Sequence, residues 1–101
     1  MKLIAVLGLK DFQQELKEAL KKVEVPLFSR IDIHGVREIG GQPDMSNWFG
    51  SSTGSESSVA FFAFVPEKEA EEILKVIKQL NEQREGVNPF HAFQLSVDKY
   101  V

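Results

Sequence analysis

Hydrophobic and polar positions along the first quarter of the chain follow the spacing of a strand and then of a helix. Residues 3–7, Leu-Ile-Ala-Val-Leu, form a continuous apolar run that ends at Gly8, which predicts a strand covered on both faces. Apolar side chains then recur at helical spacing in residues 12–23, after a candidate N-cap at Asp11. We therefore expect an amphipathic helix that ends before Pro26.

Two further strands are expected in the middle of the chain. In residues 27–35, apolar or small side chains alternate with a polar face that carries Arg30, Asp32 and His34. This charged face predicts a strand at the edge of a sheet or beside a solvent cleft. Residues 59–65 are apolar on both faces, which predicts a strand that is covered on both sides.

The last third of the chain repeats the helix and strand pattern. A helix is predicted from Pro66 to about Arg84, because apolar residues recur at helical spacing and acidic side chains crowd the first turns. A last strand is predicted at residues 90–97. The resulting order is that of a ferredoxin-like βαββαβ sandwich, an α+β fold with a four-stranded antiparallel sheet. We expect one domain over residues 1–101.

The two predicted helices can cover only one face of the predicted sheet. In this topology the first and third strands are central, and both carry apolar side chains on their two faces. The second face therefore needs another cover. We expect a homo-oligomer built through this face, with partial cover by the segment between the second and third strands as the alternative.

No hydrophobic periodicity continues through residues 38–58, which are rich in glycine, serine and threonine. Insertions of this length without secondary structure are uncommon and are usually functional or disordered. The segment also contains Asn47, Trp48, Phe49 and Gly50, and tryptophan is among the residues that dominate protein interfaces. These four residues are candidates for partner binding, and packing of the two rings onto the chain itself is the alternative.

Composition and charge narrow the classes of function. Of the 101 residues, 43% are hydrophobic and 27% are charged, which is ordinary for a packed globular protein. The formal net charge is -3 and the basic residues form no stripe, which argues against nucleic-acid binding. The absence of cysteine excludes disulfides and thiolate metal ligands. No apolar run approaches the ~20 residues of a membrane span and no catalytic motif is found, so we expect a cytoplasmic protein that is not an enzyme.

Four strings, in the order and spacing of one family, resemble PII signalling proteins. Residues 1–8 resemble the first PII strand, and residues 15–20 (ELKEAL) match a helix pattern that commonly contains VKEAL. Residues 31–35 (IDIHG) match the TEVKG or SEVRG that follows, and residues 65–77 (VPEKEAEEILKVI) match the strand-to-helix junction VPDEQVEAVIEAI. The resemblance covers nearly the whole chain.

The resemblance implies a compact homotrimer in which residues 38–58 are the T-loop, the arm that engages a regulated partner such as a membrane transporter. It also implies small effectors, of which an adenine nucleotide or bicarbonate is expected, in clefts between subunits. Residues 85–93 (EGVNPFHAF) stand where the family carries a glycine-rich phosphate loop, and Pro89 offers no N–H to a phosphate. The effector-binding residues near the base of the loop would be His34, Gly35, Arg37, Glu38, Arg84 and His91.

The two histidines also suggest a second function. His34 shares a strand face with Asp32, and two imidazoles with a carboxylate can bind a divalent transition metal, above all when neighbouring subunits contribute ligands. Their spacing matches no metal signature, so His34 and His91 can equally be unrelated residues near the ends of two strands. A CutA-like or other metal-handling trimer of the same fold is therefore the alternative to a PII-like regulator.

Overall fold

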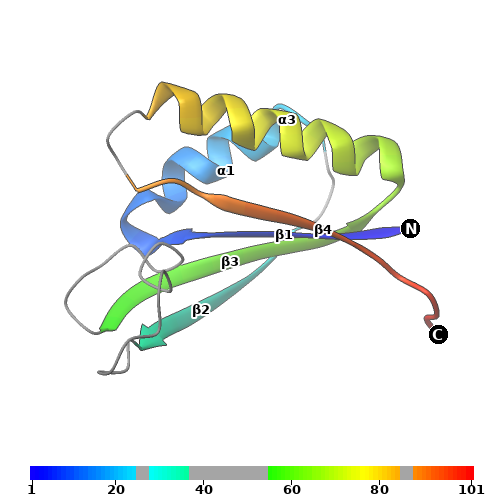
Figure 1. Cartoon of the computed structure of the whole chain (residues 1–101), viewed down its shortest axis with the longest axis horizontal. Coiled ribbons are helices and arrows are strands. Elements are labelled where there is room, and N and C mark those ends of the chain that lie inside the picture. The colour runs from blue at the N-terminus through cyan, green and yellow to red at the C-terminus, as the bar shows by residue number, and fades with distance from the viewer. Residues whose placement is uncertain (25–27, 37–54, 85–87) are drawn as a thin grey trace.

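The protein is an α+β sandwich in which two helices lie on one face of a four-stranded antiparallel sheet (Figure 1). The computed structural model describes residues 1–24, 28–36, 55–84 and 88–101. The order of elements is the predicted one. The elements are β1 (Lys2–Leu9), the short 3-10 helix η1 (Lys10–Phe12), α1 (Gln13–Lys21), β2 (Ser29–Val36), β3 (Ser55–Val65), α3 (Glu67–Gln83) and β4 (His91–Ser96).

The strand order β2-β3-β1-β4 puts β1 and β3 in the centre of the sheet, as the sequence predicts. All three neighbouring pairs are antiparallel, and Ile4 of β1 lies opposite Ala63 of β3 on one side and Gln94 of β4 on the other. The two central strands are the ones with apolar side chains on both faces. The strand with the charged face, β2, is an edge strand, which confirms its predicted position.

The hydrophobic core lies between the two helices and the sheet face that they cover. Every second residue of the central strands points into it, because side chains alternate between the two faces of a strand. The helices contribute the stripe that their helical spacing predicts. The best buried members are Ile4 and Val6 of β1, Val59 of β3, Leu16 of α1, and Ala70 and Ile73 of α3, all with no exposed surface.

Two boundaries differ from the predicted ones. β3 begins at Ser55 rather than at Val59, so the last four residues of the predicted insertion 38–58 belong to this strand. They pair with β2, and this pairing uses backbone groups that apolar periodicity does not reveal. Asp11, the predicted N-cap of the first helix, lies inside η1, and α1 begins after Phe12 without a side-chain cap.

Candidate functional site

The sheet face turned away from the helices is apolar, and in the part of the chain that the structure describes no helix lies on it (Figure 1). Phe64, Leu3 and Leu95 form one row across β3, β1 and β4, and Phe62 and Phe93 belong to the next row. We call this surface the open face. Its apolar members are Leu3, Ala5, Leu7, Leu9, Ile31, Ile33, Ala60, Phe62, Phe64, Phe93 and Leu95.

Three large side chains of the open face are about half exposed. The exposed fractions are 56% for Phe64, 50% for Leu95 and 49% for Ile31. The Phe62 and Phe64 rings meet edge to face, with centroids 6.5 Å apart. Four strands about 4.8 Å apart and about 20 Å long give a sheet face on the order of 400 Å². This is within the range of the largest apolar patch of a typical monomer, which is often functional.

The ends of all four strands and of α3 meet at one end of the sandwich, on the left in Figure 1, where η1 and α1 also begin. β1, β2 and α3 end there, and β3 and β4 begin there. We call it the junction end. Four of the predicted effector-binding residues, His34, Gly35, Arg84 and His91, lie at this end.

The two histidines lie on opposite faces of the sheet. His34 follows Asp32 on the same face of β2, and Asp32 lies opposite the buried Val59 on the helix side. His91 lies opposite Leu7 on the open face. They also belong to the two edge strands, which three strand spacings of about 4.8 Å separate. One chain therefore does not bring them together, and the described residues contain no cluster of three or more His, Cys, Asp or Glu side chains that could hold a metal.

Arg84 is engaged in its own chain. Its guanidinium donates hydrogen bonds to the Glu15 carboxylate and to the Asn88 carbonyl, the latter over 3.0 Å. It also lies 4.3 Å from the centroid of the Phe12 ring and 4.6 Å from that of Phe90. Only 8% of the residue is exposed. These contacts tie the end of α3 to the start of α1 and to the segment before β4, so an effector would meet Arg84 only if it displaced them.

The segment before β4 is held in place by Phe90. The Phe90 N–H donates to Asn81 Oδ1 and the Asn81 amide donates to the Phe90 carbonyl, both over 2.8 Å. The Phe90 ring lies against Gly8, where an added Cβ would come within 2.6 Å of Phe90 Cε1. In this segment, which stands where PII proteins carry a phosphate loop, Pro89 has no N–H and Phe90 donates its N–H to Asn81.

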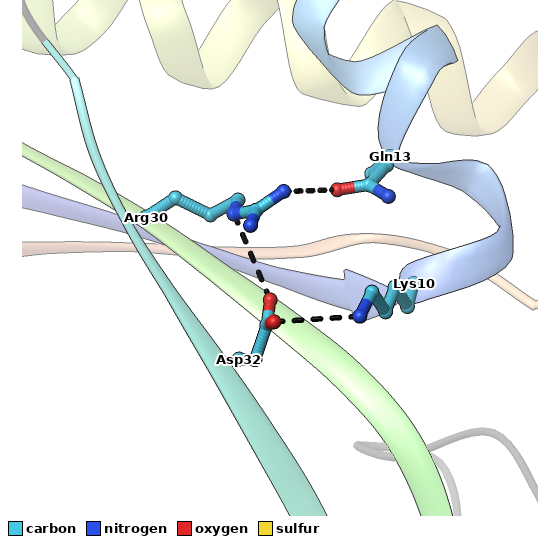
Figure 2. Close-up of polar contacts among 4 residues, drawn as sticks. All are labelled: Lys10, Gln13, Arg30 and Asp32. Carbon is cyan, nitrogen blue, oxygen red and sulfur yellow. Dashed lines mark hydrogen bonds and ion pairs between the residues drawn. The ribbon is translucent and has the colours of Figure 1, made fainter.

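A polar network joins the edge strand β2 to the turn after β1 (Figure 2). Lys10 Nζ lies 3.3 Å from Asp32 Oδ2, and Arg30 Nε lies 3.6 Å from Asp32 Oδ1. Arg30 also donates to Gln13 Oε1 over 2.9 Å. The alternation of polar and apolar residues in β2 predicts its charged face. The sequence does not indicate that Gln13 is the partner of Arg30, because this contact depends on how α1 packs beside β2.

The remaining predicted site residues differ in whether the structure describes them. Gly35 belongs to β2 and lies opposite Glu56. The predicted effector residues Arg37 and Glu38 lie outside the described residues. So do the four predicted partner-binding residues Asn47, Trp48, Phe49 and Gly50.

Comparisons with known proteins support the fold and leave the family open. No protein-family model matches the chain. No curated protein matches it either. The fold matches 130 chains of solved structures. One of them is a DUF3240 family protein from Shewanella baltica OS155, with a TM-score of 0.67 and 15% sequence identity. The match covers 99% of this chain and 92% of that chain. A likeness at this identity shows the fold alone, and one fold serves many functions.

Among the described residues, neither helix combines the length and the apolar composition needed to cross a membrane.

Proposed function

We propose that this chain is a PII-like signalling protein. Three copies assemble through their open faces, a small effector binds in the clefts between them, and residues 38–58 then act on a partner protein such as a membrane transporter. The chain works by binding and carries out no reaction. The observation that carries the proposal is the open face, where half-exposed Ile31, Phe64 and Leu95 have no cover from either helix.

The open face supports an oligomer because it is apolar along all four strands. The largest apolar patch of a monomer is about 300–600 Å² and is often functional, so a face of this size is a candidate interaction surface. β1 and β3 carry Val6 and Phe61 on the covered face and Leu7 and Phe62 on the open one. A central strand that is apolar on both faces is typical of a sheet with a layer on each side. A second copy of the chain offers an identical apolar face, so it supplies that layer without another partner.

The junction end supports an effector site between copies of the chain. His34 lies there on the helix side and His91 on the open face, so the two histidines of one chain belong to different surfaces. An effector that contacts both needs a second copy. The fold it shares with a DUF3240 family protein is consistent with this proposal and specifies no effector.

Between the two expected effectors, we favour bicarbonate over an adenine nucleoside triphosphate. A triphosphate needs several backbone N–H groups that point into one loop. Pro89 has none, and Phe90 donates its N–H to Asn81. A small anion needs fewer donors and no phosphate loop.

The mass of the protein in solution tests the assembly. We expect about three times the chain mass of 11.4 kDa for the natural sequence, measured by light scattering. Phe64→Glu places a charge in the open face and is expected to give a monomer. Gln79→Glu adds the same charge to an exposed position of α3 and is the matched control, with an unchanged mass. A monomeric or dimeric natural protein, or a trimeric Phe64→Glu variant, would contradict the proposed assembly.

Thermal unfolding in the presence of adenine nucleotides, bicarbonate, zinc or copper tests the effector. A ligand that binds only the folded protein raises its melting temperature. Stabilisation by bicarbonate or a nucleotide, lost when Arg37 and His91 are replaced by alanine, supports the regulator. Stabilisation by a metal alone, lost in a His34 and His91 double alanine variant, would instead favour the CutA-like alternative.

A further inference from the structure

A hollow beside the second half of α1 has the features of a ligand site. It has a volume of about 210 Å³ and lies between α1 and the start of β2, on the helix side of the sheet. Leu20 and Phe61, both buried, contribute to it, and Phe28 adds a partly buried ring. Lys17 and Lys21 complete the lining. The hollow therefore combines apolar walls with two ammonium groups.

The two lysines are placed to hold an anion. Lys17 and Lys21 are one helical turn apart, and two like charges at this spacing repel each other. Among the residues that the structure describes, neither takes part in an ion pair, whereas Lys2 pairs with Glu67 and Lys10 with Asp32. An anion between the two ammonium groups would remove this repulsion.

Contacts at the neighbouring turn show that this side of α1 faces β2. Gln13, Lys17 and Lys21 follow one another at intervals of four residues, so they share one side of the helix. Gln13 accepts a hydrogen bond from Arg30 of β2 (Figure 2). Phe28 comes two residues before Arg30 and lies on the same face of that segment. The positive charges and the apolar walls therefore border the same hollow, which we call the groove.

We propose that this groove binds a small organic carboxylate that carries one aromatic ring or a short alkyl chain. The apolar part would occupy the hollow, and the carboxylate would lie between Lys17 and Lys21. An apolar cavity of about 150 Å³ in another protein accepts a benzene ring. A volume of 210 Å³ therefore has room for one ring and a short linker.

This site is independent of the proposed function. It lies on the helix side, all its lining residues come from one chain, and it shares no residue with the open face or with the predicted effector site. A monomeric variant such as Phe64→Glu is expected to keep it. Carboxylate binding can therefore fail while the trimer forms, and the trimer can fail while the carboxylate binds.

Titration with phenylacetate, followed by amide NMR shifts, tests the proposal. We expect saturable shifts at Lys17, Leu20 and Phe28, with a Kd on the order of 1 mM for a ligand of this size. The neutral phenylacetamide and the ring-free acetate are expected to bind about tenfold more weakly, because each lacks one of the two parts that the groove recognises. Equal affinity for either analogue, or no shifts with phenylacetate up to about 10 mM, would overturn the proposal.

Two pairs of variants distinguish a specific effect of Lys17 and Lys21 on binding from a general effect of surface charge. Lys17→Gln combined with Lys21→Gln is expected to weaken phenylacetate binding about tenfold, since it removes the two positive charges and keeps polar, slightly shorter side chains. Lys75→Gln combined with Lys78→Gln removes the same charge from exposed positions of α3 and should leave the Kd unchanged. An equal effect of both pairs would overturn the site. All four positions are exposed, so the variants are expected to fold.

Discussion

The two faces of the sheet differ in what covers them, although the same strands build both. On the helix side, Ile4, Val6 and Val59 have no exposed surface. On the open face, one residue further along the same strands, Leu3 and Leu7 are partly exposed and Phe64 is 56% exposed. Side chains of comparable hydrophobicity thus have different surroundings in one chain. The sequence encodes two apolar layers, and the helices account for one of them.

The two faces therefore differ in what they contribute to folding and to assembly. The covered face explains why the chain folds, because burial of its side chains is the main favourable term in folding. The open face contributes less to folding of a single chain, so its apolar side chains point to an interaction. Substitutions on the two faces should therefore separate folding from assembly.

The largest expected effect belongs to Ile73→Ala on the covered side. Ile73 has no exposed surface, so the substitution removes buried methyl groups and leaves a cavity between α3 and the sheet. We expect a loss of about 3 kcal/mol in the free energy of unfolding. Urea unfolding at a concentration that keeps the chain monomeric measures it. A loss below about 1 kcal/mol would mean that this face is less tightly packed than the structure shows.

Arg84→Ala should have the next largest effect, because the contacts of this residue join α1, α3 and the segment before β4. Removing the guanidinium leaves Phe12 and Phe90 without their neighbour and the Asn88 carbonyl without a donor. We expect a loss of about 2 kcal/mol. Arg30→Ala is the control, since Arg30 is in a half-exposed ion pair and should cost under about 1 kcal/mol. Equal losses in urea unfolding would show that the burial of Arg84 adds nothing.

Gly8→Ala and Ala5→Val together compare the covered and the open face within β1. A Cβ at Gly8 would overlap the Phe90 ring on the covered side, so the ring and the segment before β4 must move. We expect a loss of about 1 to 2 kcal/mol. Ala5→Val adds volume to the open face of the same strand and should change the free energy of unfolding by less than about 0.5 kcal/mol. If Ala5→Val costs as much in urea unfolding, the open face is covered within the chain.

The smallest expected effect on the monomer belongs to Leu95→Ala. Half of Leu95 is exposed, so the loss in free energy of unfolding should stay below about 1 kcal/mol at low protein concentration. The same substitution should weaken self-association, measured by sedimentation over a range of concentrations. A loss similar to that of Ile73→Ala, with unchanged association, would contradict the distinction between the faces.

Much of the fold could be predicted because its signals are local. The apolar runs of β1 and β3, the helical spacing of α1 and α3 and the alternation of β2 gave the order of the elements and the central strands correctly. The sequence does not predict the start of β3 at Ser55, because the side chains there are polar. This part of the strand pairs with β2 through backbone hydrogen bonds, which the hydrophobic pattern does not reveal.

The surroundings of the candidate site residues were harder to predict, because they depend on contacts between distant parts of the chain. From the sequence, Arg84 is a cation at the end of a helix, where an exposed side chain is expected. In the structure it is buried and bonded to Glu15, which is 69 residues away in the chain. The hollow beside α1 was missed for the same reason, since Lys17 and Phe61 become neighbours only when α1 packs onto the sheet. The open face could be predicted, because two helices cover only one face of the sheet and the central strands are apolar on both faces.

The central position of β1 has a consequence for the newly made protein. β1 is synthesised before both of its neighbours, and Lys2 eventually lies opposite Val65 of β3 and Ser96 of β4. Until those strands leave the ribosome, the apolar β1 has no partner for its backbone groups, and such unpaired strands are prone to aggregate. We therefore expect the sheet to form late and slowly, because its central pairings join residues far apart in the chain.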